Sequence, residues 1–145
     1  MSHNIRIKRI DTSLPLPEYK TKGAVALDLS SRETTIIPPK EIRYLPLNVV
    51  IENPDNCFIL IAPRSSLHKI GIMQANGIGI VDRDFCGEKD EYHFAAFNFT
   101  DKEVTIEKGT RIAQILALEF KPIEWEEVES MNKESRGGFG STGRK

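Results

Sequence analysis

Two aspartates stand two residues apart in a short glycine-rich stretch of this chain, Ala75–Glu88. Side chains alternate along an extended backbone, so the carboxylates of Asp82 and Asp84 would point to the same side. Two carboxylates on one side can bind a cation or activate a water molecule. Gly77 and Gly79 would let a ligand approach the backbone closely. The same composition is typical of a surface turn with solvated acids, so the stretch alone leaves both interpretations open.

A second stretch carries groups that bind anions. Arg64, Ser65 and Ser66 directly follow a short apolar run. A guanidinium, two hydroxyls and the free N–H groups of a following turn together make an anion site. The alternative is a helix N-cap, in which Ser65 or Ser66 satisfies backbone donors, and the two interpretations are compatible. Lys69 would either add positive charge to this site or remain solvated.

A third candidate lies near the C-terminus. Phe139 stands alone among glycines and serines, shortly after Arg136. Nothing in residues 132–145 can pack a core, so this segment is predicted to be a mobile arm. An aromatic ring on a flexible arm can close over a planar ligand and stack on it. A disordered tail without function would have the same glycines and serines, so this alternative stays open.

The last candidate is an acid within an apolar run. Asp28 is the single charge in residues 24–29, and it is either a site residue or a strand-end acid bonded to a turn. The candidates together comprise an anion cradle, a carboxylate pair beside a glycine-rich backbone, and an aromatic arm. This combination suits a nucleotide, with its phosphates, a metal ion, an attacking water and a stacked base.

The elements that must position these residues are short and extended. Apolar runs recur between Pro, Gly, Asn and Asp, and several alternate with the period of a half-buried strand. We expect one longer strand over 45–51, a strand buried on both faces over 58–61, and a strand over 111–118, although the last also fits a helix face. The further expected strands are 5–10, 24–29, 34–37, 91–99 and 104–107.

This pattern predicts an all-β fold of about ten short strands, a sandwich or barrel with at most one or two helical turns. The predicted domain organisation is one body, residues 1–131, followed by the arm, residues 132–145. The chain has 145 residues, enough to bury a core in a single domain. No internal repeat or linker is apparent.

Composition excludes several classes of function. Apolar residues make up 39% and charged residues 28%, and the net charge is −1, as in ordinary globular proteins. No long basic run suggests a nucleic-acid partner, and no apolar run is long enough to span a membrane. The N-terminus lacks the apolar core of a signal peptide. Cys57 and Cys86 do not make a disulfide framework, so we expect reduced thiols and a cytoplasmic location.

Five segments, in this order, resemble the five motifs of the trimeric dUTP pyrophosphatases (dUTPases). They contain the patterns Pro-Arg-Ser-Ser-Leu, Gly-x-x-Asp-x-Asp-Phe-x-Gly-Glu, Gly-x-Arg-x-Ala-Gln and Gly-Phe-Gly-Ser-Thr-Gly, and the resemblance covers nearly the whole chain. The segments are 24–30, 63–69, 76–88, 109–114 and 136–143. The resemblance implies a jelly-roll-type β-barrel in a homotrimer, with each active site built from three subunits and closed by a neighbour's arm. It also implies hydrolysis of dUTP to dUMP and pyrophosphate, with Mg²⁺ across the triphosphate.

The resemblance also assigns roles to single residues. Asp82 would orient and deprotonate the water that attacks the α-phosphorus, and Asp84 would be structural, pairing with an arginine or ordering the turn. Phe85 would lie under the deoxyribose and leave no room for a ribose 2′-hydroxyl. Asp28 would help to hold the metal through water. The other residues implied are Asn76, Gly79, Ile80 and Val81 for uracil; Arg64, Ser65, Ser66 and Gln114 for the phosphates; and Arg136, Phe139, Gly140, Ser141 and Thr142 on the arm.

The sequence departs from the family pattern in three places. Ala26 stands where the first motif usually has glycine, and the loop after Gly87 is longer than usual. The fifth motif is shorter between its arginine and Gly-Phe-Gly, so that Arg144 or Lys145 would share the role of Arg136.

Two other functions are compatible with the same fold. A dCTP deaminase, or a bifunctional deaminase and dUTPase, shares an Arg-Ser-Ser segment but would lack the aspartate at position 82. A non-catalytic regulatory relative would be expected to lose either Asp82 or Phe139. Both residues are present here, and this favours the dUTPase interpretation.

Overall fold

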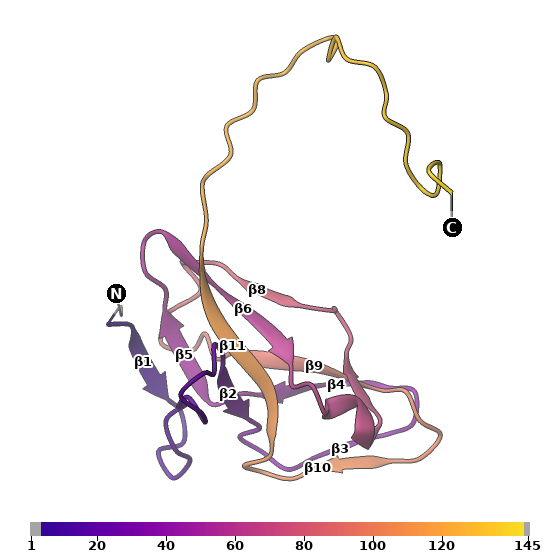
Figure 1. Ribbon diagram of the computed structural model, residues 1–145. Coiled ribbons are helices and arrows are strands. Elements are labelled where there is room, and N and C mark those ends of the chain that lie inside the picture. The colour runs from indigo at the N-terminus through magenta and orange to yellow at the C-terminus, as the bar shows by residue number, and fades with distance from the viewer. Residues whose placement is uncertain (1–3, 144–145) are drawn as a thin grey trace.

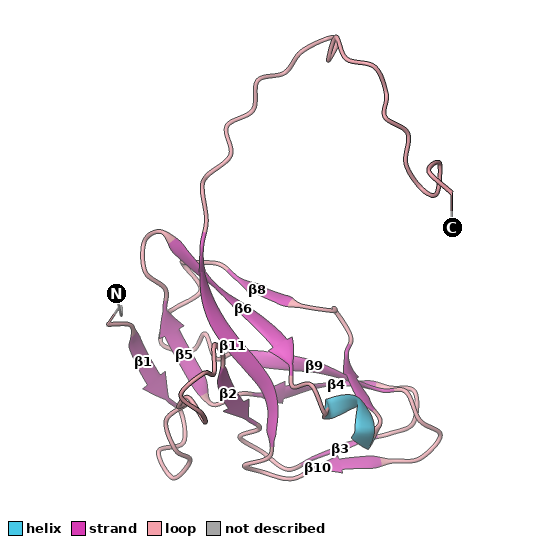
Figure 2. Ribbon diagram, viewed as in Figure 1, coloured by secondary structure: helices cyan, strands magenta, loops and turns pink. Residues whose placement is uncertain are grey.

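The computed structural model describes residues 4–143, which form eleven strands and one short 3-10 helix (Figures 1 and 2). The helix is η1 (Leu67–Ile70). The strands are β1 (Arg6–Arg9), β2 (Leu27–Ser30), β3 (Thr35–Ile37), β4 (Ile42–Pro46), β5 (Val49–Glu52), β6 (Cys57–Pro63), β7 (Ile72–Gln74), β8 (Gly79–Val81), β9 (His93–Asn98), β10 (Val104–Ile106) and β11 (Arg111–Glu119). The predicted all-β fold is confirmed, and the segment that also fitted a helix is strand β11.

The described strands pair antiparallel in four sheets. The largest has the order β2-β11-β6-β8, and a three-stranded sheet has the order β4-β9-β7. β1 pairs with β5, and β10 pairs with β3. In Figure 1 the sheets curve around a shared interior, with the long β11 between β2 and β6. Hydrogen bonding within residues 4–143 does not close them into one continuous ring.

The core takes one face of most strands, as the alternation in the sequence predicts, although β5 is buried at three consecutive residues. Along β9, Phe94 and Ala96 are buried while their neighbours are more exposed. β2 and β11 contribute Leu29 and Ile115, and β4 contributes Leu45. Because every sheet places apolar side chains in the same cluster, burial of this cluster joins the four sheets.

Two expectations about strands are wrong. The strand expected over 45–51 is interrupted at Asn48, whose φ of 69° is left-handed and breaks the extended chain. The segments on either side, β4 and β5, therefore join different sheets. β6 is not buried on both faces: Ile59 and Ile61 point into the core, whereas Leu60 between them is only half-buried.

The C-terminal segment leaves the body where β11 ends at Glu119, and it runs away from the sheets (Figure 1). All side chains from 121 to 143 are exposed, including the large apolar Ile123 and Trp125. The boundary expected after residue 131 stays a prediction. Helical structure among the described residues is limited to η1, and no helix there has the length and hydropathy to cross a membrane.

Candidate active site

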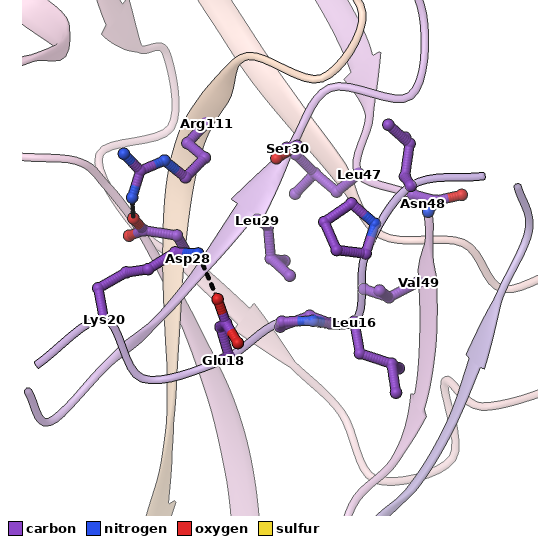
Figure 3. A pocket seen from close by; sticks show the side chains of 13 residues that line it. Leu16, Glu18, Lys20, Asp28, Leu29, Ser30, Leu47, Asn48, Val49 and Arg111 are labelled. Atoms are coloured by element: carbon purple, nitrogen blue, oxygen red, sulfur yellow. Dashed lines mark hydrogen bonds and ion pairs between the residues drawn. The ribbon is translucent and has the colours of Figure 1, made fainter. Parts of the chain in front are cut away.

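Four side chains from three strand ends meet on the largest sheet. Gln114 of β11 is level with Asp28 of β2 on one side and with Ala62 of β6 on the other. Arg111 Nη1 donates a hydrogen bond to Asp28 Oδ2 at 2.8 Å (Figure 3), and Arg64 Nε lies 3.2 Å from the same oxygen. Gln114 Nε2 donates to the Pro63 carbonyl at 2.9 Å. We call Asp28, Arg64, Arg111 and Gln114 the acid–arginine cluster.

The cluster is half-buried and polar. The side chain of Asp28 is 16% exposed, and both of its arginine partners use Oδ2. Within the described residues, Oδ1 makes no hydrogen bond or ion pair. Two cations on one carboxylate leave a net positive charge, which favours an anion such as a phosphate. The sequence analysis did not predict Arg111 as a site residue. Arg111 is the arginine of the Gly-x-Arg-x-Ala-Gln pattern, three residues before Gln114, and this position could have indicated it.

The cluster continues into the turn after β6. Arg64 N donates to the Ile112 carbonyl at 3.1 Å, and this bond fixes the strand end against β11. Ser65 and Ser66 are exposed. Ser66 occupies the N-cap position of η1, but its side chain makes no capping hydrogen bond. The alternative that Ser66 caps the helix with its hydroxyl is therefore wrong, and both hydroxyls remain available to a ligand.

The pair of aspartates lies on a separate surface, at the end of β8. Phe85 N donates to the Asp82 carbonyl at 3.2 Å and closes a tight turn, which we call the Asp82–Phe85 turn. The carboxylates of Asp82 and Asp84 are exposed, and neither makes a hydrogen bond or ion pair within residues 4–143. A backbone bond closes the turn within residues 4–143, and the structural role expected for Asp84 stays a prediction. Arg83 instead lies over the ring of Phe120, with its Cζ 5.4 Å from the ring centroid.

The glycine-rich hairpin precedes this turn. Gly77 has a φ of 73° and its N–H donates to the Gln74 carbonyl, so this position requires a left-handed residue. A Cβ at Gly79 would lie 3.1 Å from Ile61 Cβ, so a larger residue here would crowd the packing of β8 on β6. Asn76 Nδ2 donates to the Ile78 carbonyl at 3.1 Å. The expected base-reading residues Gly79, Ile80 and Val81 form β8 itself, which ends the sheet and leaves one backbone edge unpaired.

A single chain does not bring the two surfaces together. Asp28 is level with Gln114, whereas Val81 is level with Ala117 through Ile59. Asp28 and Val81 are separated by three strand spacings across the sheet and by three residues along the strand direction. Their Cα atoms therefore lie about 17 Å apart. Asp82 follows Val81 in the direction away from the cluster. Arg64 and Asp82 of one chain therefore cannot both contact neighbouring atoms of one phosphate group.

The residues expected on the arm lie apart from both surfaces. The side chains of the arm residues are all exposed, and the arm extends away from the sheets (Figure 1). Ser141 N donates to the Gly138 carbonyl at 3.1 Å, so a local turn surrounds Phe139. These exposed residues are Arg136, Phe139, Gly140, Ser141 and Thr142. The alternatives Arg144 and Lys145 lie outside the described residues.

Metal binding by protein side chains alone has no support in the described chain. Within residues 4–143, no three His, Cys, Asp or Glu side chains gather in a way that could hold a metal ion. A single carboxylate, Asp28, with one free oxygen beside two guanidinium groups instead suits Mg²⁺, which keeps several waters and binds substrate phosphates.

Comparison with known proteins identifies the family. The family model described as dUTPase matches residues 12–143, which include all five motif segments. The chain belongs to the dUTPase family. A deoxyuridine 5'-triphosphate nucleotidohydrolase of Dictyoglomus turgidum is 41% identical over 96% of this chain and 97% of that protein. The protein of the same name from Rickettsia felis is 37% identical, with 96% of each chain covered.

Solved dUTPase structures have the same fold. A dUTPase from Streptococcus mutans matches with a TM-score of 0.75 and 25% identity, covering 82% of this chain and 98% of that one. The dUTPase of Staphylococcus bacteriophage 80alpha, solved with dUPNHPP, matches with a TM-score of 0.85 and 21% identity over 98% and 99% of the two chains. The predicted dUTPase-like fold is thereby confirmed.

Proposed function

We propose that this protein hydrolyses dUTP to dUMP and pyrophosphate, which keeps uracil out of DNA and supplies dUMP for the synthesis of dTMP. The observation that carries the proposal is that the chain belongs to the dUTPase family over nearly its whole length and retains Asp82 of the third motif segment. A relative named deoxyuridine 5'-triphosphate nucleotidohydrolase is 41% identical. Asp82 remains on an exposed turn beside Phe85, where its carboxylate is open to a substrate.

The Asp82–Phe85 turn supplies the chemistry in this proposal. Asp82 takes a proton from the water that attacks the α-phosphorus, and a positioned general base contributes about 10²–10⁴ to the rate. The half-exposed ring of Phe85 lies under the deoxyribose and excludes a 2′-hydroxyl. Asn76 and the unpaired backbone edge of β8 read the edge of uracil. A site built to hydrogen-bond one base edge rejects another base strongly.

The acid–arginine cluster binds the triphosphate. Arg64 supplies a guanidinium and Ser65 and Ser66 supply exposed hydroxyls, while Gln114 lies on the adjacent strand. Asp28 would hold Mg²⁺ through water by its free oxygen, together with oxygens of the substrate phosphates. When bound, Mg²⁺ neutralises charge that develops on the phosphates.

The active site is shared between subunits of a homotrimer in this proposal. Support comes from the distance of about 17 Å that separates Asp28 from Val81 within one chain, whereas contact between copies would place one surface beside the other surface of a neighbour. The exposed segment between β11 and the arm offers Ile123 and Trp125, and burial of such side chains against a neighbouring copy would be favourable. Arg136, Phe139, Gly140, Ser141 and Thr142 then close a neighbour's site, with Phe139 stacked on uracil.

The remaining expectations belong to the same proposal. The partner molecules are the nucleotide and other copies of the chain, without nucleic acid or membrane, and the location is the cytoplasm. The relatives named above come from bacteria. A dCTP deaminase and a non-catalytic relative remain as alternatives, and neither accounts for the retention of both Asp82 and Phe139.

The decisive experiment is a comparison of pyrophosphate release from dUTP, dCTP, dTTP and UTP, with and without Mg²⁺. We expect release from dUTP far above that from the other three nucleotides, at a rate that falls sharply when Mg²⁺ is chelated. Ammonia release from dCTP would establish the deaminase, and absence of turnover with all four nucleotides would overturn the proposal.

Sharing of the site is tested with two inactive variants. Asp82→Asn and Arg64→Ala are co-expressed with different tags, and mixed oligomers are purified through both tags. If each site takes Asp82 and Arg64 from different subunits of a trimer, about one third of the sites are intact in the mixed trimers. No recovery of activity would show that both residues act within one chain.

The arm is tested by deletion of residues from Ser135 onward. We expect turnover of dUTP to fall about 100-fold, because closure aligns the substrate with the catalytic groups. An unchanged rate would show that the arm is only a tail.

A further inference from the structure

The Asp82–Phe85 turn carries two of the proposed functions but has little structure of its own. One backbone hydrogen bond, from Phe85 N to the Asp82 carbonyl, closes it. Asp82, Arg83 and Asp84 are exposed. β8, which leads into the turn, has only three residues and pairs with β6 on one side. A general base displaced by about 1 Å can cost about 10² in rate, so another element must hold this turn.

Tyr92 contacts one end of the turn directly and is linked to the other end through Asn53. Its side chain is buried, with 1% exposure, and its ring stacks on Phe85 at a centroid distance of 6.3 Å and an interplanar angle of 25°. Its hydroxyl donates to Asn53 Oδ1 at 3.4 Å, and Asn53 Nδ2 donates to the Val81 carbonyl at 3.2 Å. One side chain thus supports Phe85 directly, and it supports the residue before Asp82 through Asn53.

Tyr92 is itself fixed by the backbone on either side of the left-handed residue Asn48. Leu47 N donates to the Tyr92 carbonyl at 2.8 Å, and Tyr92 N donates to the Val49 carbonyl at 2.9 Å. Burial, and secondarily the nearby Cys86, raises the pKa of Tyr92, so its hydroxyl keeps the proton that it donates to Asn53.

The longer loop after Gly87 delivers Tyr92 to this place. Asp90 Oδ2 accepts a hydrogen bond from Gly87 N at 2.7 Å and closes the loop on itself. Glu91 then makes a bidentate ion pair with Arg32, at 2.7 and 3.0 Å, and accepts a hydrogen bond from Asn48 N at 3.0 Å. This pairing raises the pKa of Arg32. Bidentate pairs fix geometry as well as contribute energy, so the loop is a rigid support.

We propose that Tyr92 is a positioning residue for the Asp82–Phe85 turn, and that the longer loop after Gly87 serves to place it there. The ring holds Phe85 against the sugar and so sets the discrimination between deoxyribose and ribose. The hydroxyl, acting through Asn53, holds Val81 and hence the base Asp82. The inference rests on the proposed roles of Asp82 and Phe85.

The test measures kcat/KM for dUTP and for UTP, and takes their ratio as the sugar discrimination. Tyr92→Leu removes the ring, and we expect the ratio to fall about tenfold, within the range that contact with one side chain gives. Tyr92→Phe keeps the ring and loses the hydroxyl, so the ratio should stay unchanged while kcat for dUTP falls about threefold.

The matched control is Phe94→Leu. Phe94 is equally buried two residues further along the chain, and its ring does not stack on Phe85. We expect this variant to lose thermal stability as Tyr92→Leu does, without a change in the ratio. Equal falls in the ratio for both variants would mean that Tyr92 acts only through general stability, and this would overturn the inference.

A further variant separates this inference from the proposed function. Phe85→Ala should lower the ratio by itself, and an unchanged ratio would overturn the role of Phe85 and with it the inference. If Phe85→Ala lowers the ratio and Tyr92→Leu does not, the sugar filter stands and the positioning role of Tyr92 is wrong. If Tyr92→Phe leaves kcat unchanged, the link through Asn53 to the base is wrong.

Discussion

The two surfaces proposed to bind one substrate are built in opposite ways. In the acid–arginine cluster, side chains from β2, β11 and the turn after β6 hold one another: Asp28 accepts a hydrogen bond from Arg111, forms an ion pair with Arg64 and lies within a sheet. In the Asp82–Phe85 turn, the two carboxylates have no such partners among the described residues. Arg83 is held by the Asp55 carbonyl and the Phe120 ring, and Tyr92 supports Phe85 from below.

This difference follows from what each surface does. A phosphate-binding surface benefits from fixed, concentrated charge, and paired strands provide it. A general base must have its carboxylate free for water, since a carboxylate that is already paired with a cation is a weaker base. The turn therefore keeps Asp82 unpaired and takes its rigidity from an apolar ring and a backbone carbonyl.

The largest effect is expected for Asp82→Asn. Turnover of dUTP should fall by about 10²–10⁴, because the amide cannot take the proton from water. The variant should keep its melting temperature and still bind a non-hydrolysable dUTP analogue in calorimetry, since Asp82 has no partner in the described chain to lose. Asp84→Asn is the matched control and should retain most activity. Undiminished turnover in Asp82→Asn would remove its assignment as the base.

Asp28→Asn should behave differently, because Asp28 is tied into its surface. Loss of the charge leaves Arg64 and Arg111 facing each other, and we expect the free energy of unfolding to fall by about 1–3 kcal/mol. The Mg²⁺ concentration needed for half-maximal binding of the analogue should rise. Denaturation at one protomer concentration and calorimetry measure the two effects. If Asp28→Asn and Asp82→Asn changed the free energy of unfolding and the Mg²⁺ dependence of binding equally, the proposed difference between the two surfaces would be wrong.

A smaller effect is expected for Arg111→Met, which keeps the aliphatic stem and removes the charge. KM for dUTP should rise about threefold to tenfold with little change in kcat, because Arg111 orients Asp28 and adds charge at the cluster. Lys20→Met is the control. Lys20 and Arg111 line one pocket beside Asp28, but Lys20 pairs with Glu18 (Figure 3). Equal changes in the two variants would indicate a general electrostatic effect.

The smallest effect is expected outside both surfaces, at the exposed pair of Asp11 and Lys108. The hydrogen bond from Lys108 holds the pKa of Asp11 below its usual range, so the pair contributes stability above a pH of about 4 and loses it as the pH falls further. Asp11→Asn should therefore lower the melting temperature slightly at pH 7, and the difference should shrink below pH 4. A difference that grows on acidification would contradict the sign of this shift.

Alternation in the sequence was sufficient to locate most strands, because which face of a strand is buried depends on residues two apart. It could not locate the break at Asn48, where the chain changes sheet, or the half-exposed face of β6, because both depend on what packs against the strand. The motifs singled out Asp82, Phe85, Arg64 and Gln114 by residue type and order. Their roles remain predictions.

The sequence by itself determined the family, the strand-rich fold and the residue types available for binding a nucleotide, since these are written in local patterns. Only the tertiary structure decided which of them meet. Asp28, Arg64 and Arg111 are far apart along the chain and come together because β2 and β6 flank β11. The same sheet separates them from Asp82, and the loop after Gly87 places Tyr92 beneath Phe85. Contacts of this kind depend on strand order and packing, which no short stretch of sequence specifies.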